Sequence, residues 1–117
     1  PSMLDLGYAS QLELLQSLDA AGNPPVVVCS DKLQASPEHI LEALCSTLGL
    51  PWEPGMMAWE PGARAEDGPW APWWYKGVHA STGWEARPVK THLVPEHLLE
   101  LHGACLGAYH ALLERAL

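Results

Sequence analysis

The chain has 117 residues, 48% of them hydrophobic, and a net charge of −8 from 14 acidic and six basic side chains. That length suits one domain with a core of its own, and no apolar run reaches the roughly 18 residues that span a bilayer. The negative charge argues against nucleic acids and anionic membranes as partners. Three cysteines in apolar runs, and no visible signal peptide, lead us to expect reduced thiols in a cytoplasmic protein.

The first expected elements are a helix over residues 6–21 and a strand over residues 25–30. Leucines recur at roughly helical spacing in the helix, and Gly22 with the prolines that follow it ends the pattern. Residues 26–29 read VVVC, a continuous run that is typical of a strand covered on both faces. Ser30 then stands at the carboxyl end of the strand, where α/β folds place ligands.

Two more helices are expected, over residues 36–48 and 95–115. Ser36 can cap the first of them, Pro37 fits its first position, and Gly49 ends it. Apolar side chains line one face of the second helix. The segment between the two is rich in tryptophan, glycine and proline, which predicts loops with short helical turns. The fold class is therefore α/β and helix-rich, with one clear strand and three main helices in a single domain.

A single strand leaves backbone groups without a ladder, because a sheet needs a second strand. Either residues 26–29 pair with another copy of the chain, or the chain is part of a larger α/β protein. On the last helix Gly103, Gly107 and Ala111 repeat every four residues and share one face, which would let another backbone approach closely. The expected partner is therefore either a second copy, giving a homo-oligomer, or a missing N-terminal portion.

Residues 64–90 gather most of the positive charge. Four of the six basic residues, Arg64, Lys76, Arg87 and Lys90, lie in this stretch. They are either solvated loop charges or a local anion site. The aromatic residues of the same region either form the core of a helix-poor segment or line a pocket.

The sequence predicts no catalytic residue and no metal site. His97 and Glu100 share a helix face, but no third ligand has matching spacing, so a solvated acidic face is the better interpretation. His79 has the chemistry of a general base at neutral pH, yet the spacing yields no Ser-His-Asp or Cys-His pairing.

Several motifs stand in a fixed order along the chain. The expected strand leads into Ser30-Asp31-Lys32-Leu33, then a helix that begins at Pro37 and ends in Leu48-Gly49-Leu50-Pro51, then Glu66-Asp67-Gly68-Pro69-Trp70-Ala71 and Ser81-Thr82-Gly83-Trp84. This order resembles the C-terminal part of the P-loop sulfotransferases. It is also similar to a bacterial sulfotransferase-like subfamily in which some members carry aminotransferase-like labels. The resemblance covers roughly residues 6–86.

The resemblance implies a doubly wound α/β fold that transfers a sulfuryl group from PAPS to a hydroxyl or an amine. In that family a phosphate-cradling loop follows the first strand, upstream of the part that this chain resembles. The present sequence contains no glycine-rich loop of that type. Ser30 stands where the family has a tyrosine that contacts the adenine. The isolated chain is therefore expected to be inactive, and no metal is expected.

The resemblance and the residue chemistry together select the candidate site residues. Lys76-Gly77 resembles the Arg-Lys-Gly segment that grips the 3′-phosphate, and Ser81 and Thr82 offer hydroxyls to an oxyanion. The candidates for binding PAPS or PAP are Lys76, Gly77, Ser81, Thr82 and Ser30. The candidates for a substrate pocket are Trp70, Trp74, Tyr75, Trp84 and Arg64. The alternative roles are structural: a surface lysine, a turn or helix cap, and core aromatics.

Two functions remain open at this point. The first is a partial sulfotransferase-like domain, in which sulfuryl transfer from PAPS requires a missing N-terminal P-loop portion. The second is a non-catalytic module derived from the same scaffold, used for small-molecule binding or for dimerisation.

Overall fold

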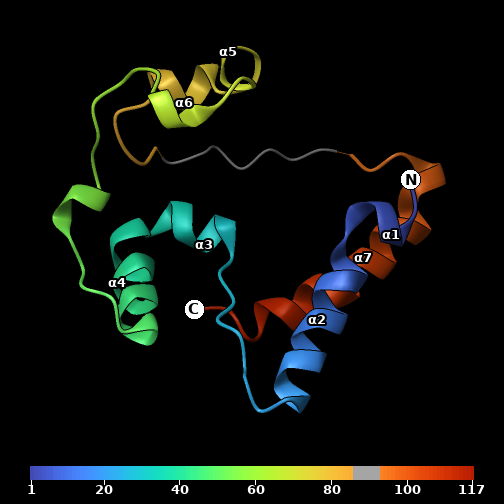
Figure 1. Cartoon of the computed structure of the whole chain (residues 1–117). Helices are drawn as coiled ribbons and strands as arrows, with labels where there is room; N and C mark the ends of the chain where they lie inside the picture. The colour runs from blue at the N-terminus through green and yellow to red at the C-terminus, as the bar shows by residue number, and fades with distance from the viewer. Residues whose placement is uncertain (86–92) are drawn as a thin grey trace. The chain divides into compact units, whose positions relative to one another are not determined.

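The computed structural model describes residues 1–85 and 93–117, which divide into two compact units (Figure 1). Unit 1 combines residues 1–30 with the described residues from 93 onwards, and unit 2 holds the middle of the chain from residue 31. That residues 1–117 form a single domain stays a prediction.

Unit 1 is a small helical assembly of α1 (Met3–Leu6), α2 (Tyr8–Ala20), η3 (Glu96–Leu98) and α7 (Leu99–Leu113). α2 and α7 pack side by side, and α1 contacts both of them (Figure 1). The side chains buried here are Leu15 of α2 and Cys105 and Ala108 of α7, and Cys105 Sγ lies 3.3 Å from Met3 Sδ of α1. The helix predicted over residues 95–115 is thus present as η3 followed by α7.

The helix predicted over residues 6–21 is present but is broken near its start. Gly7 adopts a φ of +74°, a left-handed conformation that a helix interior does not contain, and it separates α1 from α2. At the other end Gly22 has a φ of +73°, and the N–H of Asn23 donates to the carbonyl of Leu18 at 3.0 Å. This is the glycine-dependent helix end that the sequence predicts.

The strand predicted over residues 25–30 is absent from the structure. Only Val27 pairs, through an isolated parallel bridge with Ala116, and the N–H of Leu117 donates to the carbonyl of Val27 at 3.1 Å. A ladder needs several residues on each side, and the chain after α7 supplies one bridge only. Ser30 does not extend the strand either, because it begins helix α3 (Ser30–Ala35).

Unit 2 contains most of α3, then α4 (Pro37–Leu48), η1 (Pro54–Met56), η2 (Ala65–Asp67), α5 (Ala71–Trp74) and α6 (Lys76–Ala80). α4 matches its prediction, with Pro37 in its first turn and Gly49 ending it at a φ of +66°. Ser36 precedes this helix but its side chain makes no capping hydrogen bond, which corrects that detail. Ile40 and Cys45 point inward from α4 and are buried.

Candidate functional site

The tryptophan-rich stretch of unit 2 is a loop that closes on itself at its base. Ala58 and Gly83 form an isolated antiparallel bridge, and the N–H of Trp59 donates to the carbonyl of Thr82 at 3.1 Å. Gly83 suits this close approach, since a Cβ there would lie 3.1 Å from the carbonyl oxygen of Met57, a tighter contact than most Cβ atoms make. The backbone crossing therefore holds η2, α5 and α6 between two fixed ends.

Two tryptophans and a serine pack inside the base of this loop. The indole N–H of Trp59 donates to Ser81 Oγ at 3.1 Å, and Ser81 Oγ donates to the carbonyl of Val78 at 2.7 Å. The rings of Trp59 and Trp84 meet edge to face with centroids 6.1 Å apart, and the indole N–H of Trp84 donates to the carbonyl of Met56 at 3.0 Å. Ser81 and Trp84 thus stabilise the loop itself.

A polar cluster lies between η2 and α6. His79 Nε2 and Asp67 Oδ2 are 2.8 Å apart, and the same carboxylate oxygen accepts the backbone N–H of Arg64 at 2.8 Å. The hydrogen bond from Arg64, and then that from His79, hold the pKa of Asp67 below its usual value of 3.8. A guanidinium N–H of Arg64 donates to the carbonyl of Glu60 at 3.1 Å. Asp67 therefore fixes the position of the imidazole and one end of η2.

A small hollow adjoins this cluster. It is lined by Trp59, Glu60, Gly62, Arg64, Asp67, Val78 and His79, and its volume is about 40 Å³. A hollow of that size holds water, whereas pockets for small organic ligands measure roughly 300–1,000 Å³. The described part of unit 2 therefore offers a cation, an imidazole and a carboxylate beside a water-sized space.

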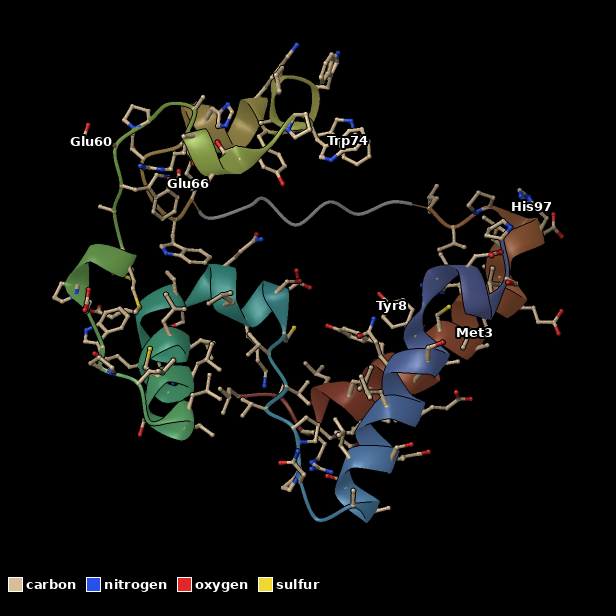
Figure 2. The ribbon with its side chains drawn as sticks, in the orientation of Figure 1. Met3, Tyr8, Glu60, Glu66, Trp74 and His97 are labelled. Atoms are coloured by element: carbon tan, nitrogen blue, oxygen red, sulfur yellow. The ribbon has the colours of Figure 1, made fainter. Side chains whose placement is uncertain are left out.

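The candidate site residues lie on different sides of this loop. Trp70 and Trp74 are 69% and 80% exposed, so they do not line the hollow. Figure 2 shows Trp74 projecting away from the ribbon of α5 and α6. Tyr75 turns the other way and meets the ring of His79 edge to face at 6.0 Å. The residues proposed for one substrate pocket are thus divided between an outer and an inner face.

The candidates for binding the nucleotide also differ in what their side chains do. Lys76 and Gly77 form the first turn of α6, and Thr82 is exposed just beyond it. No hydrogen bond joins the side chain of Lys76 or of Thr82 to another described residue, so both are available to a ligand, in contrast to Ser81. Ser30 belongs to unit 1 and is described below.

The sequence did not single out the pairing of Asp67 with His79. Its one local signal is the three-residue spacing from Arg64 to Asp67, which allows the carboxylate to cap the start of η2. Among the described ranges, no group of three or more histidine, cysteine, aspartate or glutamate side chains is placed to hold a metal ion. Arg87 and Lys90, which the sequence grouped with the other cations, lie outside the described residues.

Unit 1 carries two larger hollows that share Leu6, Tyr8 and Tyr109. One measures about 290 Å³ and is also lined by residues 27–30, including Ser30; the other measures about 310 Å³ and is lined almost wholly by apolar groups of α7 and its approach. The rings of Tyr8 and Tyr109 meet edge to face at 6.3 Å between the two. Both hollows reach the lower end of the range for small ligands.

Comparison with known proteins identifies the lineage. The model of the sulfotransferase domain family matches residues 2–116. The chain belongs to the sulfotransferase domain family. This agrees with the resemblance found in the sequence, and it extends the match beyond residue 86 to nearly the whole chain.

Two curated relatives come from Arabidopsis thaliana. Branched-chain-amino-acid aminotransferase-like protein 1 is 44% identical over 86 residues, which are 74% of this chain and 16% of that protein. Branched-chain-amino-acid aminotransferase-like protein 2 is 36% identical over 111 residues, which are 95% of this chain and 20% of that protein. The chain thus spans a fifth or less of each relative's length. No solved structure matches it.

Within the part of the chain that the structure describes, no helix has both the length and the apolar character needed to cross a bilayer.

Proposed function

We propose that this chain is part of a sulfotransferase domain that transfers a sulfuryl group from PAPS only when a phosphate-binding loop completes it. The observation that carries the proposal is the family match over residues 2–116 in a sequence without a glycine-rich phosphate loop. Such a loop supplies the backbone N–H groups that hold phosphate oxygens. The share of 20% or less in the relatives is consistent with a completing portion elsewhere in a longer protein.

Within this proposal unit 2 supplies the rear of the nucleotide site. Lys76, at the start of α6, would hold the 3′-phosphate of PAPS, and the hydroxyl of Thr82, just past the end of α6, would offer the nucleotide a further hydrogen bond, because both side chains are exposed. Arg64 and His79 would face the acceptor side, where a cation stabilises developing negative charge and an imidazole takes a proton. The hollow beside Arg64 and His79 measures about 40 Å³, which is too small for a nucleotide. Residues from the completing portion would therefore have to form the rest of the nucleotide site.

Titration calorimetry of the 117-residue chain with PAP tests the need for the missing loop. We expect no binding tighter than about 1 mM, since one lysine and one hydroxyl supply little affinity alone. A sulfotransferase that has the loop serves as the positive control. Micromolar binding of PAP by this chain would contradict the proposal, and if Lys76→Ala left that binding unchanged, the choice of Lys76 would fail as well.

A second candidate function is a non-catalytic module that binds a small molecule. The two hollows of unit 1 favour it, because at about 290 and 310 Å³ they reach the lower end of the range for small ligands. Ligand-observed NMR with a fragment set tests it. If the Tyr109→Ala variant no longer binds a fragment that the Lys76→Ala variant still binds, the ligand site lies in unit 1.

We also propose a cytoplasmic location and no nucleic-acid or membrane partner. The location is supported by Cys45 and Cys105, which are buried thiols outside any disulfide, as expected in a reducing compartment. The partner proposal is supported by the net charge of −8.

A further inference from the structure

His79 differs from the other histidines that the structure describes, because its side chain is paired with a carboxylate. His79 Nε2 lies 2.8 Å from Asp67 Oδ2, and the exposed fractions of the two side chains are 20% and 23%. The other described histidines are exposed and form no ion pair with a described residue: His39, His97, His102 and His110. The pair is thus partly sheltered from water, where a hydrogen bond to an ionised group is stronger than at the surface.

The carboxylate decides which nitrogen of His79 carries the hydrogen. Asp67 Oδ2 also accepts the backbone N–H of Arg64 at 2.8 Å, and the hydrogen bonds from Arg64 and His79 hold the pKa of Asp67 below 3.8, so this group is ionised at neutral pH. An ionised carboxylate has no hydrogen to donate, and therefore the imidazole must be the donor, at Nε2. In the neutral ring the free lone pair then belongs to Nδ1.

Nδ1 of His79 is open to a reacting group. It forms no hydrogen bond with another described residue. Among the described side chains that are not exposed, no polar atom without a hydrogen bond is shut off from solvent. Because His79 is half-buried, its Nδ1 must therefore reach solvent. The adjoining hollow of about 40 Å³, which Arg64 and His79 both line, has room for a water molecule or a hydroxyl group.

The backbone and a neighbouring ring hold the imidazole in place. The N–H of His79 donates to the carbonyl of Tyr75 at 2.7 Å, and the carbonyl of His79 accepts the N–H of Gly62 at 2.7 Å. The rings of Tyr75 and His79 meet edge to face with centroids 6.0 Å apart. Together with the hydrogen bond to Asp67, these contacts leave the imidazole few orientations, as a group that exchanges protons in a fixed geometry requires.

We propose that His79 and Asp67 form a proton-accepting pair, in which His79 Nδ1 is the basic atom and Asp67 is the positioning residue. The inference deepens the proposed function and rests on it for the reaction. There His79 Nδ1 takes the proton of an acceptor hydroxyl as the hydroxyl oxygen replaces a phosphate oxygen on the sulfur of PAPS. The displaced phosphate oxygen keeps the electron pair of the broken bond. Asp67 stays ionised and stabilises the imidazolium that forms.

Nitrogen NMR of the 117-residue chain with ¹⁵N-labelled histidine tests the assignment of the basic atom. At about pH 8, where an ordinary imidazole is neutral, we expect a hydrogen-bonded proton on Nε2 of His79 and none on Nδ1. The exposed histidines should show the average of both tautomers. Asp67→Ala should abolish the Nε2 proton signal, because the ring loses its acceptor. Glu66→Gln, which removes the same charge one residue away, should keep the signal.

Circular dichroism must show that both variants keep the helix content of the parent chain, although the parent spectrum is decisive by itself. If His79 of the parent carries its proton on Nδ1, or averages like the exposed histidines, the proposal is overturned. A signal that persists in Asp67→Ala shows that Asp67 does not position the ring, and overturns it too.

Diethyl pyrocarbonate tests whether Nδ1 is accessible. The reagent transfers one ethoxycarbonyl group to an unprotonated ring nitrogen and releases carbon dioxide and ethanol. We expect His79 to be modified at Nδ1, at a rate within about tenfold of that of the exposed His97, because neither side chain has to wait for the chain to open. A His79 that stays unmodified, or that is modified at Nε2, contradicts the proposal. Neither measurement involves PAP, so its outcome is separate from that of the calorimetry that tests the need for the missing loop.

Discussion

Two glycines of unit 1 should respond in opposite directions to the same substitution. Gly22 has a φ of +73° after α2, whereas Gly103 lies inside α7, and a Cβ at either position would meet nothing within 4 Å. Gly22→Ala should lower the free energy of unfolding by about 1 kcal/mol, because alanine is strained in the left-handed region. Gly103→Ala should raise it by about 0.5–1 kcal/mol through helix propensity. Urea unfolding measures both, and equal signs would contradict this account.

The carboxylate of Asp67 should make unfolding depend on acidity. The pKa of Asp67 is about 3.8 in the unfolded chain and lower in the folded chain. The ionised carboxylate therefore stabilises the fold above pH 3.8, and this contribution is lost as the pH falls through the pKa of the folded chain. Asp67→Asn should therefore remove part of the loss of stability that the parent chain shows towards about pH 3. Glu66→Gln removes the same charge one residue away. If the two variants had identical pH profiles, the hydrogen bonds of Asp67 would not be the cause.

The candidate site illustrates what single residues reveal in a sequence. Lys76 and Thr82 were chosen for their chemistry, and the structure leaves both exposed, so their roles stay predictions. The sequence gives the residue type of Trp74 and Trp84 but not their exposure, and they differ: one projects outward while the other packs on Trp59. Which ring packs inward depends on the crossing of residues 58 and 83, a contact distant in sequence.

Among the helices, α2 offers two adjacent leucines with contrasting surroundings. Leu15 is 5% exposed and lies against α7, while Leu14 is 59% exposed. Leu15→Ala should lower the free energy of unfolding by about 2–3 kcal/mol, because it leaves a cavity between the helices. Leu14→Ala should change it by less than about 0.5 kcal/mol. Chemical denaturation compares them, and similar losses would show that α2 does not pack through Leu15.

Helices with local signals were predicted well, and the strand was not. Pro37 and Gly49 are start and stop signals that act within α4, so the sequence alone places both its ends correctly. Residues 26–29 have the composition of a strand, but a ladder depends on a partner that α7 reaches with only one bridge, at Ala116. α3 was missed because Ser30 was assigned to the end of that strand.

At the scale of the whole molecule, the two units have little enclosed apolar volume. The buried residues that the structure describes are Leu15, Cys105 and Ala108 in unit 1, and Ile40, Cys45 and Ala71 in unit 2. Most of these side chains are small, and no described side chain is completely enclosed. Since burial of apolar surface is the main favourable term in folding, each unit alone should be weakly stable.

This small core leads to a prediction for the temperature of unfolding. Calorimetry of the dilute chain should give a midpoint no higher than about 45 °C, the low end for ordinary domains. A midpoint above about 65 °C would contradict this account, because it would mean that these few buried residues give the chain the thermal stability of an ordinary domain.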